Sequence, residues 1–216
     1  MLKSPSGLVP VRTVAGGNCL FRAAITACAA NVVGQCDINY DLLQEKIAEE
    51  LAANARWYGK EMERHTAIAA QSPDCRFTQI ALFSSCLSER GIATLERTLR
   101  DPSGGGTAVA FQNSKAVEAE SEATRANGCY ALLYHLCVIA NILKVRINSV
   151  YPEVNKGLRP LLHTTVEPLD CPTRAEITIM WSSTVKASKN VTFVRLNHCL
   201  PLLSAGTFTK GPPLAS

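Results

Sequence analysis

The hydrophobic pattern of the chain changes its period at residue 144, and this change limits the folds that the chain can adopt. Residues 129–143 are almost continuously apolar and predict a buried helix, whereas the next residues, Lys144–Val150, alternate with period two and predict a strand. Helical spacing dominates the first two thirds, and the last third adds predicted strands at residues 177–181, 191–194 and 198–203. This order favours an α/β (α+β) fold in which helices pack on a small β-sheet.

The first two thirds of the chain predict several further elements. We expect an edge strand over Val9–Val14, a helix from Cys19 to about Asn31, and a long amphipathic helix that Asp41 caps and that ends near residue 65. The apolar face of the long helix begins with Leu42, and Gln44 lies on its polar face. Further on we expect helices at residues 77–90 and 92–99, a loop at 101–107, an exposed helical turn within 115–125 and an irregular connection over 152–168.

Length and composition favour one sizeable domain. The chain has 216 residues, of which 47% are apolar, and we expect a single domain over residues 8–204 with flexible tails at 1–7 and 205–216. A net charge of +4, with both signs mixed along the chain, argues against a nucleic-acid partner. No segment reads as a secretory signal or a membrane span. Nine cysteines without a Cys-x-x-Cys pair argue against disulfides and zinc, and predict a reducing, cytoplasmic or nuclear location.

A flexible turn precedes a thiol near the start of the chain. Gly16, Gly17 and Asn18 are turn-prone, and the alanine-rich run Leu20–Ala30 after Cys19 predicts a buried helix. A thiol at the first helical turn lies near the positive end of the helix dipole, which lowers its pKa. The backbone N–H groups before the helix are placed to hold a developing oxyanion. The pattern predicts a cysteine nucleophile; the alternative is an inert, buried cysteine.

A thiol nucleophile needs a base, and the chain contains four histidines. His65 ends a charged helical stretch and His135 lies in the buried helix, so an exposed and a structural role are favoured for them. His163 lies in the irregular connection and stays open as a base. His198 begins the last predicted strand, where a rigid element holds a side chain at the edge of solvent. We therefore favour His198 over His163.

The two ends of the chain resemble the ovarian tumour (OTU) family of deubiquitinating cysteine proteases. Residues 17–23, Gly-Asn-Cys-Leu-Phe-Arg-Ala, are similar to the family's nucleophile motif. Residues 197–202, Asn-His-Cys-Leu-Pro-Leu, are similar to its histidine motif, Asn-His-(aromatic)-x-x-(apolar). The resemblance implies a papain-like OTU-type domain with Cys19 as nucleophile and His198 as base. It also implies cleavage after the C-terminal Gly of ubiquitin or a related modifier, ubiquitinated proteins as partners, and no metal or cofactor.

The chain departs from the family pattern at two positions. The family has Asp three residues before the cysteine, where this chain has Gly16, and many members have Asp or Asn two residues after the histidine, where it has Leu200. Residues 198 and 200 share one face of a strand and Asn197 points away, so Asn197 is a poor substitute. The site is then a Cys–His dyad or takes its third group from elsewhere. We expect Leu200→Asn to raise turnover ~10-fold by supplying that group.

A second resemblance concerns the last third of the chain. Ser149–Pro152, Leu158–Pro160 and Ile179–Trp181 resemble the vertnin family of animal proteins, whose OTU-like region lacks the catalytic cysteine. This chain is similar to a relative that kept Cys19 and His198. The alternative to an enzyme is therefore a binding or scaffolding module with an idle site, because fold alone does not establish activity.

Overall fold

The computed structural model describes residues 7–14, 18–31, 38–60, 109–126, 133–152, 159–169, 173, 175–182 and 198–205. These residues form a mixed α/β fold, as the sequence predicts, around a five-stranded sheet in the order β1-β5-β4-β2-β3. The strands are β1 (Leu8–Pro10), β2 (Arg146–Val150), β3 (Thr164–Val166), β4 (Glu176–Ser182) and β5 (His198–Ser204). The helices are α1 (Cys19–Asn31), α2 (Tyr40–Ala53), α6 (Val109–Thr124), α7 (Leu133–Leu143) and α8 (Arg159–Leu162), and residues 55–60 are also helical.

The last described strand occupies an interior position in the sheet. β5 lies between β1 and β4 and runs antiparallel to both, whereas β2 runs parallel to β4 and antiparallel to β3. β5 tolerates Pro201 because the paired residues of β1 and β5 end one position earlier, at Pro10 opposite Leu202. The Pro201 carbonyl accepts a hydrogen bond from the Val11 N–H at 3.0 Å, and the proline nitrogen faces the same side, where no ladder hydrogen bond is needed.

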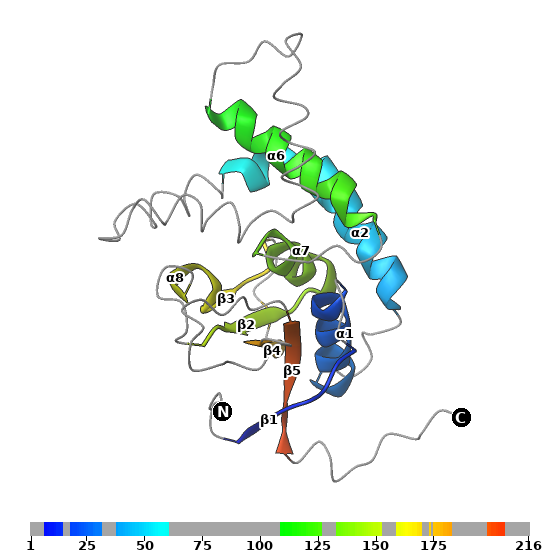
Figure 1. Ribbon diagram of the computed structural model, residues 1–216, viewed down its shortest axis with the longest axis vertical. Coiled ribbons are helices and arrows are strands. Elements are labelled where there is room, and N and C mark those ends of the chain that lie inside the picture. The colour runs from blue at the N-terminus through cyan, green and yellow to red at the C-terminus, as the bar shows by residue number, and fades with distance from the viewer. Residues whose placement is uncertain are drawn as a thin grey trace, which may run out of the picture.

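Four of the described helices form two layers, with α1 and α7 against the sheet and α2 and α6 beyond them. α1 packs against β4 and β5, and α7 contacts β2 and β3. The two helices meet where the rings of Phe21 and His135 lie 5.7 Å apart between centroids. Figure 1 shows α2 and α6 side by side, with α7 between this pair and the strands. The core therefore extends from the sheet through α1 and α7 to α2 and α6, and it includes the fully buried Phe21, Leu136 and Trp181.

The helix predicted to follow Asp41 has a different cap. Asn39, in an extended conformation, precedes α2, and its side-chain oxygen accepts a hydrogen bond from the Leu42 N–H at 2.9 Å. The prediction of Asp41 as the cap is therefore wrong by two residues. Asp41 instead lies in the first helical turn, where its negative charge interacts favourably with the helix dipole.

The apolar face predicted for α2 is buried at the residues that follow its first turn (Leu43, Ile47, Leu51, Ala55, Tyr58), but two residues differ from the prediction because α6 packs beside this face. Gln44 is 7% exposed, while Leu42 is 45% exposed. The Gln44 side-chain amide donates to the carbonyl of Thr124 at 2.5 Å and to that of Ala126 at 3.2 Å. The exposed helical turn expected within residues 115–125 is thus wrong. This stretch belongs to α6, and its small side chains (Ala116, Ala119, Ala123) are buried against the rest of the fold.

Two other expectations change in detail. The irregular connection expected over residues 152–168 contains α8 and β3, which are too short to leave a periodic pattern. β3 pairs with β2, and the Leu162 carbonyl of α8 accepts a hydrogen bond from the Ser149 hydroxyl of β2. The edge strand expected at Val9–Val14 is Leu8–Pro10, and beyond it Val11 and Thr13 still hydrogen-bond carbonyl groups of β5. The buried helix and strand at the change of period are α7 and β2, and the strand predicted at 177–181 is β4, one residue longer at each end.

Several predictions concern residues outside those described: the helices at 77–90 and 92–99, the loop at 101–107, the strand at 191–194, and four single residues, Gly16, Gly17, His65 and Asn197. Among the helices that the structure describes, none combines the length and the apolar character needed to cross a membrane.

Candidate active site

The helix α1 begins at Cys19, as the sequence predicts. The carbonyl of Asn18 accepts the first hydrogen bond of the helix, from the Arg22 N–H at 3.1 Å. Asparagine is favoured immediately before a helix because its side chain can satisfy backbone donors of the first turn. Cys19 is therefore the first helical residue, at the positive end of the helix dipole, and it is 4% exposed.

The strand β5 brings two side chains to the start of α1. The thiol of Cys199 hydrogen-bonds the Cys19 side chain, and the imidazole of His198 lies close enough to act on it electrostatically. Both residues are buried at the first two positions of β5. Because α1 packs against β5, the two predicted site residues, Cys19 and His198, meet from opposite ends of the chain.

The electrostatics of this contact make Cys19 acidic. The hydrogen bond from the Cys199 thiol lowers the pKa of Cys19 most, burial opposes it, and the Cys199 backbone and then His198 lower the pKa further. The result is a pKa of about 6 for Cys19, against an ordinary value of 9.0. Burial and the neighbouring Cys19 raise the pKa of Cys199 well above 9.0. At neutral pH, Cys19 is therefore a thiolate and Cys199 a protonated thiol that donates to it.

A residue that the sequence did not indicate holds the imidazole. The hydroxyl of Thr13 donates to the Cys199 carbonyl at 2.8 Å, and its oxygen lies 3.2 Å from Nε2 of His198. Since the hydroxyl hydrogen points to the carbonyl, the oxygen accepts at the second contact, and Nε2 of His198 carries the hydrogen. This network assigns the neutral imidazole a proton-free Nδ1.

The other ring nitrogen of His198 is unengaged. Nδ1 is buried and makes no hydrogen bond among the described residues, and hydrogen bonding to His198 is the weakest of the influences on the Cys19 pKa. The imidazole therefore lies beside Cys19 without a close hydrogen bond to its sulfur. Catalytic hydrogen bonds of this kind are often long before substrate binds.

Neither of the other described histidines approaches Cys19 as a base. His163 is exposed, accepts a hydrogen bond from the Tyr151 N–H at 3.2 Å, and precedes β3, which β4 and β2 separate from β5. His135 is fully buried, and burial lowers its pKa to about 3, so its ring is neutral at pH 7. This agrees with the structural role predicted for His135.

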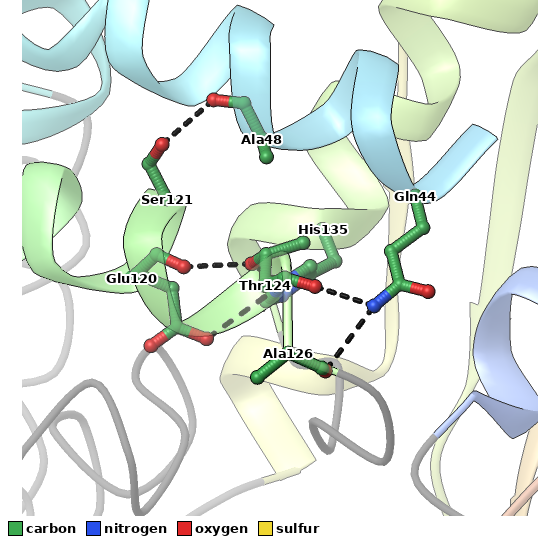
Figure 2. Close-up of polar contacts among 7 residues, drawn as sticks. All are labelled: Gln44, Ala48, Glu120, Ser121, Thr124, Ala126 and His135. Atoms are coloured by element: carbon green, nitrogen blue, oxygen red, sulfur yellow. Dashed lines mark hydrogen bonds and ion pairs between the residues drawn. The ribbon is translucent and has the colours of Figure 1, made fainter. Parts of the chain in front are cut away.

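The surroundings of His135 form a buried polar network between three helices (Figure 2). Nε2 of His135 lies 2.8 Å from the Thr124 hydroxyl and 3.6 Å from a carboxylate oxygen of Glu120. Thr124 also hydrogen-bonds the Glu120 carbonyl, and Ser121 donates to the Ala48 carbonyl at 2.7 Å. Because the imidazole is neutral, the contact with Glu120 is not a pairing of two full charges. The network joins α6 to α2 and α7.

Surface pockets lined by described residues lie near the proposed site and away from it. One, of about 320 Å³, adjoins Thr13 and is also lined by Arg12, Arg22 and Tyr40, with the Arg22 guanidinium 4.7 Å from the centroid of the Tyr40 ring. Another, of about 890 Å³, is lined by residues from the ends of α2 and α7 and includes neither Cys19 nor β5. The described residues contain no cluster of His, Cys, Asp and Glu suited to a metal ion.

Comparison with known proteins identifies relatives of the chain. A family model described as "Vertnin, OTU domain" matches residues 10–182, a range that includes Thr13 and Cys19 and ends before β5. A protein named vertnin, from Danio rerio, is 27% identical over 206 residues, which are 92% of this chain and 26% of that protein. The chain thus spans about a quarter of the length of this relative. No solved structure matches significantly.

Proposed function

Because the chain belongs to the family of vertnin OTU domains, we propose that it is a thiol hydrolase that cleaves the (iso)peptide bond after the C-terminal Gly of ubiquitin or a ubiquitin-like modifier. The observation that carries the proposal is the meeting of Cys19, at the start of a buried helix, with His198, at the start of β5. Ubiquitinated proteins are then its substrates, and residues 8–204 form one catalytic domain.

In the proposed reaction the sulfur of Cys19 attacks the carbonyl carbon of the scissile bond. His198 keeps the sulfur ionised by holding its proton at Nδ1, and then gives that proton to the leaving lysine amine. The backbone N–H groups of Gly16, Gly17 and Asn18 are proposed to hold the oxyanion of the tetrahedral intermediate. Water then hydrolyses the thioester, with His198 as its base.

Thr13 takes the part of the third group in this proposal. The Asp or Asn of the family pattern is absent at Leu200, but the Thr13 oxygen accepts from Nε2–H of His198. An acceptor at Nε2 fixes the tautomer that leaves Nδ1 available to Cys19, and it holds the ring in place. Thr13 is anchored in turn by its hydrogen bond to the Cys199 carbonyl, so it acts on the reaction by positioning the base.

A ubiquitin with an electrophile at its C-terminus tests the proposal. We expect a covalent adduct one ubiquitin heavier, which Cys19→Ala abolishes and which Cys28→Ala, a change of another buried cysteine of α1, retains. We also expect His198→Ala to lower turnover by ~10²–10⁴. Labelling at a cysteine other than Cys19, or an unchanged rate in His198→Ala, would refute the site.

One observation favours a second candidate, a non-catalytic module that binds ubiquitin or another protein. Cys19 and His198 are only 4% and 7% exposed, so both are nearly closed off from a substrate. The same probe separates the two functions. A module would bind ubiquitin without forming the adduct, with the same affinity in the chain and in Cys19→Ala.

A further inference from the structure

The residue after the proposed base is itself a thiol, and it touches the proposed nucleophile. Cys199 is 1% exposed, lies in the same core cluster as Cys19, and hydrogen-bonds its side chain. Neither forms a disulfide in this structure. A thiol that hydrogen-bonds a thiolate can form a disulfide with it after oxidation, a reaction that plays no part in hydrolysis.

We propose that Cys199 is a resolving cysteine, which forms a reversible disulfide with Cys19 when Cys19 is oxidised by hydrogen peroxide. The inference rests on the proposed function only for its consequence, which is that the oxidised site has no nucleophile and is inactive. The disulfide itself requires only the two cysteines and the peroxide.

The chemistry balances in two steps. The thiolate of Cys19 attacks one oxygen of hydrogen peroxide, the O–O bond breaks, and Cys19 becomes a sulfenic acid as hydroxide leaves and is protonated to water. The sulfur of Cys199 then attacks the sulfenic sulfur, the S–O bond breaks, and the leaving hydroxide takes the thiol proton as a second water. Two thiols are oxidised by two electrons, and one peroxide is reduced to two waters.

The order of the two steps follows from the surroundings of each thiol. Cys19 is the thiolate, with a pKa of about 6, and it retains some exposure, whereas burial keeps Cys199 protonated and almost inaccessible. Peroxide, a molecule scarcely larger than water, therefore reacts first at Cys19. Cys199 already hydrogen-bonds that side chain, on the strand against which α1 packs, so it is in place for the second step.

Other described cysteines are poorly placed to compete. Cys28 lies nine residues beyond Cys19 on the same helix, which separates their backbones by roughly 13 Å along its axis. Disulfides require Cα atoms within about 7 Å of each other. Cys137 belongs to α7, whose sheet contacts are with β2 and β3 instead of with the start of β5.

Peptide mapping tests the proposal without an activity assay. Trypsin releases Cys19 in the peptide 13–22 and Cys199 in the peptide 196–210, and each peptide contains a single cysteine. The reduced full chain is treated with hydrogen peroxide, remaining thiols are blocked with N-ethylmaleimide, and the digest is analysed without reductant. We expect the two peptides joined, with the loss of two hydrogen atoms, and their separation by dithiothreitol.

Cys199→Ser is the informative variant, because serine keeps a hydrogen-bond donor beside Cys19 but cannot form the disulfide. We expect peroxide to convert its Cys19 to sulfinic acid, which dithiothreitol does not reverse. Cys28→Ala serves as the matched control and should form the cross-link normally. Sulfinic acid at Cys19 in the unmodified chain without a cross-link, or a cross-link from Cys19 to another peptide, overturns the proposal.

The test also separates this inference from the proposed function. If the cross-link forms and the ubiquitin probe never labels Cys19, the disulfide stands and the proposed hydrolysis falls. If the probe labels Cys19 and peroxide yields no cross-link, the hydrolysis stands and the resolving role of Cys199 falls.

Discussion

Replacing Cys199 with alanine should make Cys19 a weaker acid. The hydrogen bond from the Cys199 thiol is the largest influence that lowers the pKa of Cys19, and alanine has no donor to replace it. The pKa of Cys19 should then rise from about 6 toward 9.0. The neighbouring His198, the backbone of residue 199 and the helix dipole remain, so the rise should stop short of the ordinary value.

The size of the effect follows from the fraction of thiolate, because only the thiolate is alkylated. With a pKa of about 6, the thiolate fraction is roughly 90% at pH 7 and 9% at pH 5, so the alkylation rate falls about 10-fold. With an ordinary pKa of 9.0 the same change of pH lowers the rate about 100-fold. We expect a ratio near 10 for the unmodified chain and a clearly larger one for Cys199→Ala.

The assay measures how fast iodoacetamide modifies Cys19, followed by mass spectrometry of the tryptic peptide 13–22, in which it is the single cysteine. A ratio of rates at two pH values cancels the slow access that follows from an exposure of 4%. Circular dichroism at both pH values confirms that the chain is folded.

Two controls make the result decisive. Cys199→Ser retains a donor and should keep the ratio near that of the unmodified chain, and Cys28→Ala, on the same helix, should leave it unchanged. A ratio near 100 in the unmodified chain, or an equal ratio in Cys199→Ala, would show that the Cys199 thiol does not ionise Cys19.

Three further predictions follow from the same structure. Thr13→Val, which replaces the hydroxyl with a methyl group, should lower kcat ~10–10²-fold with little change in KM, well below the ~10⁴ that follows the loss of a triad carboxylate. Thr13→Ser keeps the hydroxyl and should have the rate of the unmodified chain. A shifted pH profile of kcat in the valine variant separates positioning of the base from a general loss of structure. Since Thr13 already accepts from His198, we now expect no gain from Leu200→Asn, and a folded variant with faster turnover would argue against the role of Thr13. His135 has a pKa of about 3 when folded and ~6.5 when unfolded, so the unfolded chain binds more protons as the pH falls. The free energy of unfolding should therefore drop by about 2 kcal/mol from this residue between pH 7 and pH 5, and urea denaturation of His135→Gln should lack this part of the decrease.

The parts of the site that depend on local sequence were predicted well. A turn-prone Gly-Gly-Asn followed by an apolar run placed Cys19 at the start of a helix, because capping depends on neighbouring residues. The apolar stretch after Asn197 placed His198 at the start of a strand. Both signals are contained within about ten residues of the side chain concerned.

The parts that depend on contacts between distant segments were missed. Thr13 lies beside His198 because residues 11–14 continue along β5, and nothing in the local sequence shows that this segment meets a strand 185 residues away. The sequence contains nine cysteines and does not distinguish Cys199 from the others, because its contact with Cys19 depends on the packing of α1 against β5. Gln44 read as a surface residue because its hydrogen-bond partner, the end of α6, lies about eighty residues away.

β5 is an interior strand of the sheet and carries both His198 and Cys199, yet it is made long after Cys19 during synthesis of the chain. Cys19 is made 179 residues before His198, and at ~5–20 residues per second this separation takes roughly 10–40 s. Throughout that interval the nascent thiol lacks both His198 and the Cys199 donor. A partly made chain therefore lacks the contacts that lower the Cys19 pKa to about 6 until the strand that completes the sheet has been made.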